Sequence, residues 1–358
     1  MNAMKSIYSS PNQLLRVRGF SLIELMVSLT IGLVIAIAAF SAYLGASSSS
    51  KMTDAQSRMN EDGQAALAIL AQQLRMTGNN PRQGNRLDPY GRNPVYTDQQ
   101  PLTHTFVLGT ATTFAFTLST GTYTLANIRI HGCDGTFANV TSTTATIDSL
   151  NRSTCVTGTS TTPADSIVVN YEADRFNTIP DAAGIPADCL GYKLTQISAT
   201  LPIVTTTAPP TSTITYYMAE NRFYIGTSAA ILSPSLYCKG NGGSGTQQPL
   251  VENIEDMQFL YGTVVSNAVP APSDTATTIA PVAGYLRADQ VTDWNKVTAV
   301  RICVIVRSES PVVSETGSTN YYKCDGTLDS TKTDRRLRHA YSTTVSLRNR
   351  QLWIVPVP

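Results

Sequence analysis

The feature that most constrains this chain is an apolar run of 22 residues, 25–46, which contains no charged side chain. As an α-helix with a rise of about 1.5 Å per residue, this run would cross a hydrocarbon layer of roughly 30 Å. Lys5, Arg16 and Arg18 precede it, and an excess of positive charge marks the end that stays in the cytoplasm. The sequence therefore predicts one membrane-spanning helix, with everything after residue 50 on the far side.

A cleaved secretory signal peptide is the alternative for such an N-terminus. Its apolar region would be about 7–15 residues long and would lead into a cleavage site of small residues. The run in this chain is longer, and its last residues, 43–46, form a poor cleavage site of that kind. The length of the apolar run and the residues at its end both favour a helix that stays in the mature protein.

One carboxylate, that of Glu24, lies where the apolar stretch begins. A charged group inside a membrane costs about 2.5–3.5 kcal/mol on insertion scales, so it normally has a partner. Because Glu24 is near the edge of the run, its carboxylate could instead lie among the lipid headgroups. Composition alone favours this edge position.

Residues 18–27, RGFSLIELMV, resemble the class III signal of type IV pilins and type II secretion pseudopilins. The resemblance implies cleavage after Gly19 by a prepilin peptidase and N-methylation of Phe20. It also implies that Glu24 pairs with the freed amine of Phe20 on a neighbouring subunit during assembly. Such a pair would neutralise two opposite charges that are costly to bury alone.

The helix is expected to continue beyond the membrane to about residue 77. Apolar residues recur at spacings of three, four and seven, which is typical of a helix with one buried face. They are Met52, Ala55, Met59, Ala66, Ile69, Leu70 and Leu74. Arg75 falls in the expected last turn, and Gly78 is expected at the C′ position just beyond the helix.

From residue 78 onward the sequence predicts β-strands separated by Ser- and Thr-rich loops. Strands are expected at 113–118, 123–130, 166–171, 191–197, 297–307, 341–347 and 351–355, where β-branched and aromatic residues gather. The runs 213–218 and 222–225 flank Glu220 and Asn221 and are expected to form a hairpin. A division of the head into two lobes is expected near residues 205–213.

The predicted fold class is α+β and type IV pilin-like, with a long N-terminal helix packed on a large antiparallel β-rich head. The expected parts are a leader (1–19), a helix (20–77) and an extracytoplasmic head (78–358). The first part of the helix, 20–46, would lie in the membrane or in the filament core.

Segments of the head resemble a narrower family. Residues 250–262, LVENIEDMQFLYG, are similar to a segment of PilW-type minor pilins and GspJ-type pseudopilins. Residues 335–336 and 341–350 resemble the closing strand of PilW, and residues 294–307 resemble the strand between these segments. A GspJ-type pseudopilin is usually a much shorter chain, which favours PilW.

The PilW resemblance implies a minor pilin that helps to prime pilus assembly and lies at or near the pilus tip. The implied partners are other minor pilins, the major pilin, the prepilin peptidase, the inner-membrane assembly platform and a tip adhesin. The implied location is the inner membrane with the head in the periplasm, and then the pilus fibre. A type II secretion tip or competence pilus component is one alternative, and a membrane-tethered binding or adhesive module is another.

All six cysteines follow the apolar run and would lie on the oxidising side: Cys133, Cys155, Cys189, Cys238, Cys303 and Cys324. Six cysteines allow three disulfides in 15 pairings. Loop length favours Cys133–Cys155 and Cys303–Cys324, which leaves Cys189–Cys238. Each bond would add about 3 kcal/mol by constraining the unfolded chain.

No catalytic, cofactor or metal site is expected. His104, His131 and His339 are scattered and lack zinc-binding spacing. Residues 240–245 match G-x-G-x-x-G, but no helix-forming run follows at once, so a flexible surface loop is expected. The basic residues Lys332, Arg335, Arg336 and Arg338 alternate with acidic ones and are expected to form a solvated loop.

Charge limits the class of partner. Charged residues make up 14% of the chain, against about 25% in a typical soluble domain. With 26 basic and 25 acidic residues the net charge is +1. Loss of the three basic leader residues would leave 23 basic residues and a net charge of −2. This balance argues against nucleic-acid binding, which normally requires a strongly basic surface.

Overall fold

The computed structural model describes residues 19–78, 103–108, 112–117, 130–138, 154–156, 164–202, 211–228, 231–243, 246–264 and 282–350. The leader up to residue 18, the predicted strand at 351–355 and residues 123–129 of another predicted strand lie outside these ranges. The chain divides into two compact units, Met1–Thr53 and Asp54–Pro358.

One helix, α1 (Leu22–Met76), contributes to both units. It begins after Ser21, whose carbonyl accepts the first helical hydrogen bond from the Leu25 amide at 3.1 Å. Its N-terminal part is long and apolar enough to cross a membrane. Three hydroxyl side chains in that part, Ser28, Thr30 and Ser41, donate to carbonyls one turn earlier. Their donors are thereby satisfied within the helix, as an apolar environment requires.

The end of α1 is fixed by the head. Gly78 adopts a φ of 73°, the left-handed conformation expected of a C′ glycine, and its amide donates to the carbonyl of Asn170 at 3.0 Å. The side-chain amide of Asn349 donates to the carbonyl of Arg75 at 3.0 Å. Asn349 therefore satisfies a carbonyl of the last turn, and Asn170 of the head anchors the glycine just beyond the helix.

One sheet has the strand order β3-β4-β6-β7-β8, and β5 pairs with the N-terminal half of β6. All its pairings are antiparallel. The strands are β3 (Ile130–Cys133), β4 (Ser166–Ala173), β5 (Gln196–Pro202), β6 (Thr211–Gly226), β7 (Ser235–Lys239) and β8 (Gln248–Glu252).

A second antiparallel sheet has the order β10-β9-β11-β14. Its strands are β9 (Ile254–Val264), β10 (Val282–Leu286), β11 (Val297–Arg307) and β14 (Arg338–Ser346). Asn253 joins β8 to β9 with a φ of 63°, so the chain passes from the first sheet to the second at a single residue. Asparagine adopts this conformation more readily than most residues.

The remaining elements are short. Strands β1 (Thr103–Leu108) and β2 (Thr112–Thr117) form one two-stranded pair, and β12 (Tyr321–Tyr322) and β13 (Leu328–Asp329) form another. Single 3₁₀ turns, η4 (Ala288–Gln290), η5 (Trp294–Lys296) and η6 (Arg348–Arg350), flank β10, β11 and β14.

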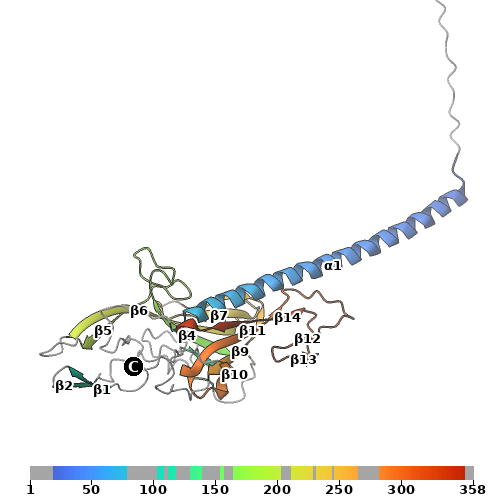
Figure 1. Cartoon of the computed structure of the whole chain (residues 1–358). Coiled ribbons are helices and arrows are strands. Elements are labelled where there is room, and N and C mark those ends of the chain that lie inside the picture. The colour runs from blue at the N-terminus through green and yellow to red at the C-terminus, as the bar shows by residue number, and fades with distance from the viewer. Residues whose placement is uncertain are drawn as a thin grey trace, which may run out of the picture. The chain divides into compact units, whose positions relative to one another are not determined.

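The C-terminal part of α1 and both sheets share one core (Figure 1). The buried residues of the helix lie on one face: Met59, Gly63, Ala66, Leu70, Ala71 and Leu74. Gly63 lies against the ring of Tyr341 on β14, where an added Cβ would come within 2.6 Å of the ring. The expected stripe thus forms from Met59 onward, while Met52 is exposed.

Two predictions about the head are wrong. The segment around Glu220 and Asn221 is not a hairpin, because β6 runs unbroken through both residues. Their polar side chains, which suggested a turn, are buried within the sheet. The region near 205–213 is not a boundary between lobes, since β5 and β6 on either side of it pair with each other and the chain from Asp54 onward forms one unit.

Other strands differ only in their bounds. The strand expected at 191–197 begins at Gln196, because Gly191 adopts a φ of 79° in the preceding turn. The strand expected at 297–307 coincides with β11, and that expected at 341–347 is β14, which begins three residues earlier.

Candidate functional site

The start of α1 exposes the residues that the pilin-like signal singles out. Gly19 and Phe20 precede the helix, and the Phe20 side chain is 82% exposed. Glu24 lies in the first helical turn, where a negative charge interacts favourably with the helix dipole. Its carboxylate is exposed and stands next to apolar side chains on the same helix. This end of the helix therefore presents one acid at the edge of an apolar surface.

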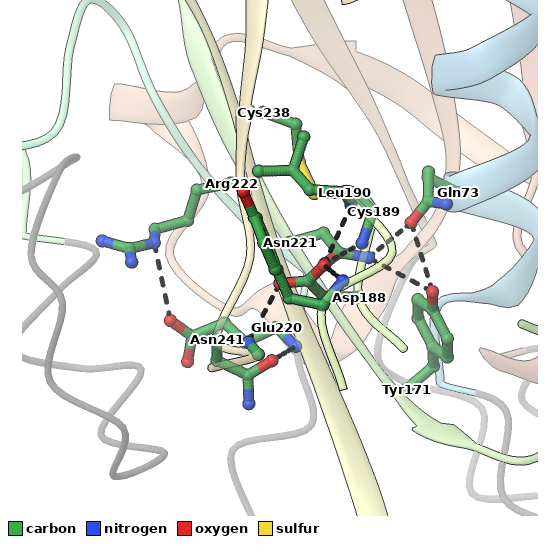
Figure 2. Close-up of a disulfide and its surroundings, with 12 residues drawn as sticks. Gln73, Tyr171, Asp188, Cys189, Leu190, Glu220, Asn221, Arg222, Cys238 and Asn241 are labelled. Carbon is green, nitrogen blue, oxygen red and sulfur yellow. Dashed lines mark hydrogen bonds and ion pairs between the residues drawn. A yellow bond between two sulfur atoms is a disulfide. The ribbon is translucent and has the colours of Figure 1, made fainter. Parts of the chain in front are cut away.

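A buried amide network holds the other end of α1 on the head (Figure 2). The fully buried Asn221 of β6 donates to the side-chain oxygen of Gln73 at 2.7 Å and lies 3.2 Å from the Tyr171 hydroxyl. Its own side-chain oxygen accepts from the Cys189 amide at 3.1 Å. One side chain thus connects the helix, strand β4 and the loop before β5.

The loop at Cys189 is fixed by a disulfide and by a carboxylate. Cys189 is bonded to Cys238 of β7. Asp188 accepts from the amides of Leu190 at 2.9 Å, Tyr192 at 3.0 Å and Gly242 at 2.9 Å. Burial raises the pKa of Asp188, although these hydrogen bonds favour the charged form.

The glycine-rich segment lies against this loop. A Cβ at Gly240 would come within 2.1 Å of the Asp188 carboxylate, and one at Gly242 within 2.2 Å of the Tyr192 carbonyl. Residues 240–242 are buried, which corrects the expectation of a flexible surface loop for this part. These glycines allow close packing within the protein and leave no room for a dinucleotide phosphate.

The other cysteines form two further disulfides, Cys133–Cys155 and Cys303–Cys324. The pairing is the one that loop length favoured, and no described cysteine is free. His131 lies near the first of these bonds, but both sulfurs there are already joined to each other, so they cannot serve as thiolate metal ligands. The ring of His131 packs on that of Trp294, with 4.7 Å between the centroids.

The basic cluster at 332–338 is not a simple solvated loop. The Arg338 side chain is only 2% exposed and lies 2.6 Å from carboxylate oxygens of both Glu255 and Asp334. Lys332 lies 3.0 Å from Glu255. Burial alone would raise the pKa of Glu255, but hydrogen bonds from Arg338 and Lys332 lower it overall. The Arg338 hydrogen bond lowers the pKa of Asp334 to about 2. This cluster joins β9 to β14.

Asp165 is a second carboxylate that joins separate segments. Its oxygens accept from the Phe259 amide of β9 at 2.8 Å and from the Gly135 amide at 3.2 Å. Burial raises its pKa to about 7, and these two hydrogen bonds offset only part of that effect.

We expect Asp165 to make the head less stable as the pH rises from about 4 to about 7. In this range the unfolded side chain loses its proton near pH 3.8 while the folded one keeps it, which lowers the free energy of unfolding by up to about 1.4 kcal/mol per pH unit. Asp165→Asn should reduce this slope, and the exposed Asp289→Asn should not. Denaturant unfolding of the detergent-solubilised chain at several pH values measures it. Equal slopes in wild type and Asp165→Asn would contradict the prediction.

Two family models match this chain, one over the start of α1 and one over the C-terminal part of the head. The family model described as Type IV Pilus-assembly protein W matches residues 222–349, from the second half of β6 to η6. The model of the prokaryotic N-terminal methylation motif matches residues 14–40, which contain Gly19, Phe20 and Glu24. The head from residue 222 onward therefore matches PilW, and the start of the chain matches the methylation motif. The PilW match contains Asn221's neighbour Arg222, all of β9, β11 and β14, and the Arg338 cluster.

The PilW match supports a role in pilus assembly, and the methylation motif at the start of a long apolar helix supports membrane anchoring. Among solved structures it is similar to the type IV-like pilin TTHA1219 from Thermus thermophilus, with 10% identity and a TM-score of 0.24. That similarity covers 53% of this chain and 81% of the other, and at this score it carries no argument about the fold. No curated protein matches the chain.

Proposed function

We propose that this chain is a minor pilin of the PilW family that primes pilus assembly and lies at or near the pilus tip with other minor pilins. The observation that carries the proposal is the combination of two features: a methylation motif at the start of an exposed apolar helix, and a head that matches the PilW model over residues 222–349. Cleavage after Gly19 would free the amine of Phe20, and Glu24 of one subunit would pair with the Phe20 amine of the next.

The proposed assembly mechanism depends on what covers the apolar helix before and after the subunit enters the pilus. The bilayer would cover the helix before assembly, with the head in the periplasm, and neighbouring helices would cover it afterwards. The Glu24 carboxylate, costly in an apolar environment, would be neutralised only when a subunit docks correctly. The pair of Glu24 and the Phe20 amine would therefore fix the axial position of one helix against the next, while the head would determine which pilin fits beside it.

A priming role predicts fewer pili and not shorter ones. Deletion of this chain, in cells that cannot retract pili, should reduce the number of pili per cell several-fold. The length of the remaining pili and the amount of major pilin in the membrane should stay unchanged, because elongation would not use this subunit. Electron microscopy of the cells gives the number and the length of the pili, and immunoblots of the membrane fraction give the amount of major pilin. A normal number of pili in the deletion strain would refute the priming role.

A further inference from the structure

The loop after β4, residues 174–180, exposes two large apolar side chains. Phe176 is 82% exposed and Ile179 is 85% exposed. Within the described part of the head, only Leu232, in a different loop, is exposed to a similar degree. These two residues, within four positions of each other, form an apolar projection. Exposure of apolar surface to water is unfavourable, so the projection does not stabilise a head that stands alone.

This 174–180 loop is held in one conformation by its own polar groups. The Asp174 carboxylate accepts from the amides of Phe176 at 2.7 Å and Asn177 at 2.9 Å. The Asn177 side chain accepts from the Asp174 amide and donates to the carbonyl of Glu172, both at 2.8 Å. The Thr178 hydroxyl donates to the carbonyl of Asp174 at 2.8 Å. A partner would therefore pay little conformational entropy to bind the exposed side chains.

Arg175 gives the projection a charge. Its guanidinium lies 4.7 Å from the centroid of the Phe176 ring. The neighbouring carboxylate of Asp174 is directed to backbone amides and not to Arg175. Aromatic residues and arginine are the types most enriched at energetically important interface positions. A matching surface would offer an apolar socket with a carboxylate at its rim.

The position of the loop favours a protein partner over a lipid surface. Tyr171 and Ala173, just before the loop, pack with Met76 at the C-terminal end of α1. The helix axis from Asp54 to Met76 is about 33 Å long, at a rise of about 1.5 Å per residue. Within the unit Asp54–Pro358, the loop therefore lies near Met76, at the opposite end of the helical segment from Asp54, where the unit begins.

We propose that Phe176, Ile179 and Arg175 form the contact by which this chain binds the head of a different pilin-type subunit. The inference rests on the proposed function, because it names the surface through which the minor pilin selects its neighbour. The subunit would receive the two apolar side chains in a socket and place a carboxylate against Arg175.

Site-specific photo-cross-linking of the full chain in pilus-producing cells tests the contact. A photoreactive phenylalanine analogue replaces Phe176 in one strain and Leu232 in a control strain, and adducts are identified by mass spectrometry. We expect an adduct from position 176 with another protein that carries an N-terminal methylation motif, and none from position 232. Adducts only with lipid, only with a second copy of this chain, or equally from both positions would overturn the proposal.

A matched set of variants gives a second readout. Phe176→Ala with Ile179→Ala should lower recovery of the chain in sheared pili roughly tenfold, as loss of interface anchors does. Leu232→Ala should change it less than twofold. Unchanged membrane levels and intact disulfides on non-reducing gels show that the variants fold. Normal recovery of the double variant in pili would overturn this inference and leave the proposed function intact. Absence of the wild-type chain from pili would overturn the proposed function. In that case the contact would still be tested by cross-linking from position 176 in the membrane fraction.

Discussion

Replacement of Glu24 by alanine is expected to lower recovery of the chain in pili by at least tenfold while the head stays folded. The reason is that the variant leaves the amine of a neighbouring Phe20 buried without its partner. Removal of one member of a buried charge pair costs about 3–5 kcal/mol, and about 1.4 kcal/mol corresponds to tenfold. Glu24 lies in the unit Met1–Thr53, which does not include the head, so the head should be unaffected.

Two matched variants separate charge from other effects. Glu24→Gln keeps the size of the side chain and removes its charge, and it should behave like Glu24→Ala. Thr30→Val lies in the same part of α1 and removes only a hydroxyl that donates to the Val27 carbonyl, so it should assemble normally. Immunoblots of sheared pili, normalised to the membrane fraction, measure recovery. Recovery of Glu24→Ala at the wild-type level would show that this carboxylate does not guide docking.

Loss of the Cys189–Cys238 bond should destabilise the head and also weaken the hydrogen-bonded contact between the head and α1. The two cysteines are 49 residues apart, for which chain entropy predicts a loss of about 4 kcal/mol in the free energy of unfolding. The bond also holds the loop whose Cys189 amide orients Asn221, and Asn221 binds Gln73 of α1. We therefore expect Cys189→Ser with Cys238→Ser to reduce hydrogen-exchange protection in residues 66–76.

The Cys303–Cys324 bond provides the control. Its cysteines are 21 residues apart, so chain entropy predicts a similar loss of about 3 kcal/mol, but neither residue belongs to the Asn221 network. Cys303→Ser with Cys324→Ser should destabilise the chain and leave protection of residues 66–76 close to that of wild type. Equal loss of protection in the two double variants would mean that the network does not couple the disulfide to the helix.

The parts of the fold that depend on local periodicity could be predicted from the sequence. The apolar stripe predicted the helix and its buried face, and Gly78 marked its end because its left-handed conformation suits glycine. The segments with resemblance to PilW correspond to β9, β11 and β14, which are consecutive in one sheet. These features follow from a short stretch of sequence each.

The buried polar contacts could not be predicted in this way. Glu220 and Asn221 resemble a turn because polar residues interrupt a strand pattern, yet Asn221 is satisfied by Gln73, 148 residues earlier. The charge pattern around Arg338 predicts a solvated loop, yet Glu255, 83 residues earlier, pairs with it. The glycines at 240 and 242 match a nucleotide-binding pattern, yet they make room for Asp188. In each case the partner lies far away in the sequence, so no local pattern reveals it.

The central claim is that this chain becomes a pilus subunit through its processed N-terminus. Mass spectrometry of sheared and purified pili tests it most directly. The account predicts a mature chain that begins at N-methylated Phe20, with its six cysteines oxidised, at a low ratio to the major pilin. A chain found only in the membrane fraction, with its leader retained or cleaved at another position, would contradict the account.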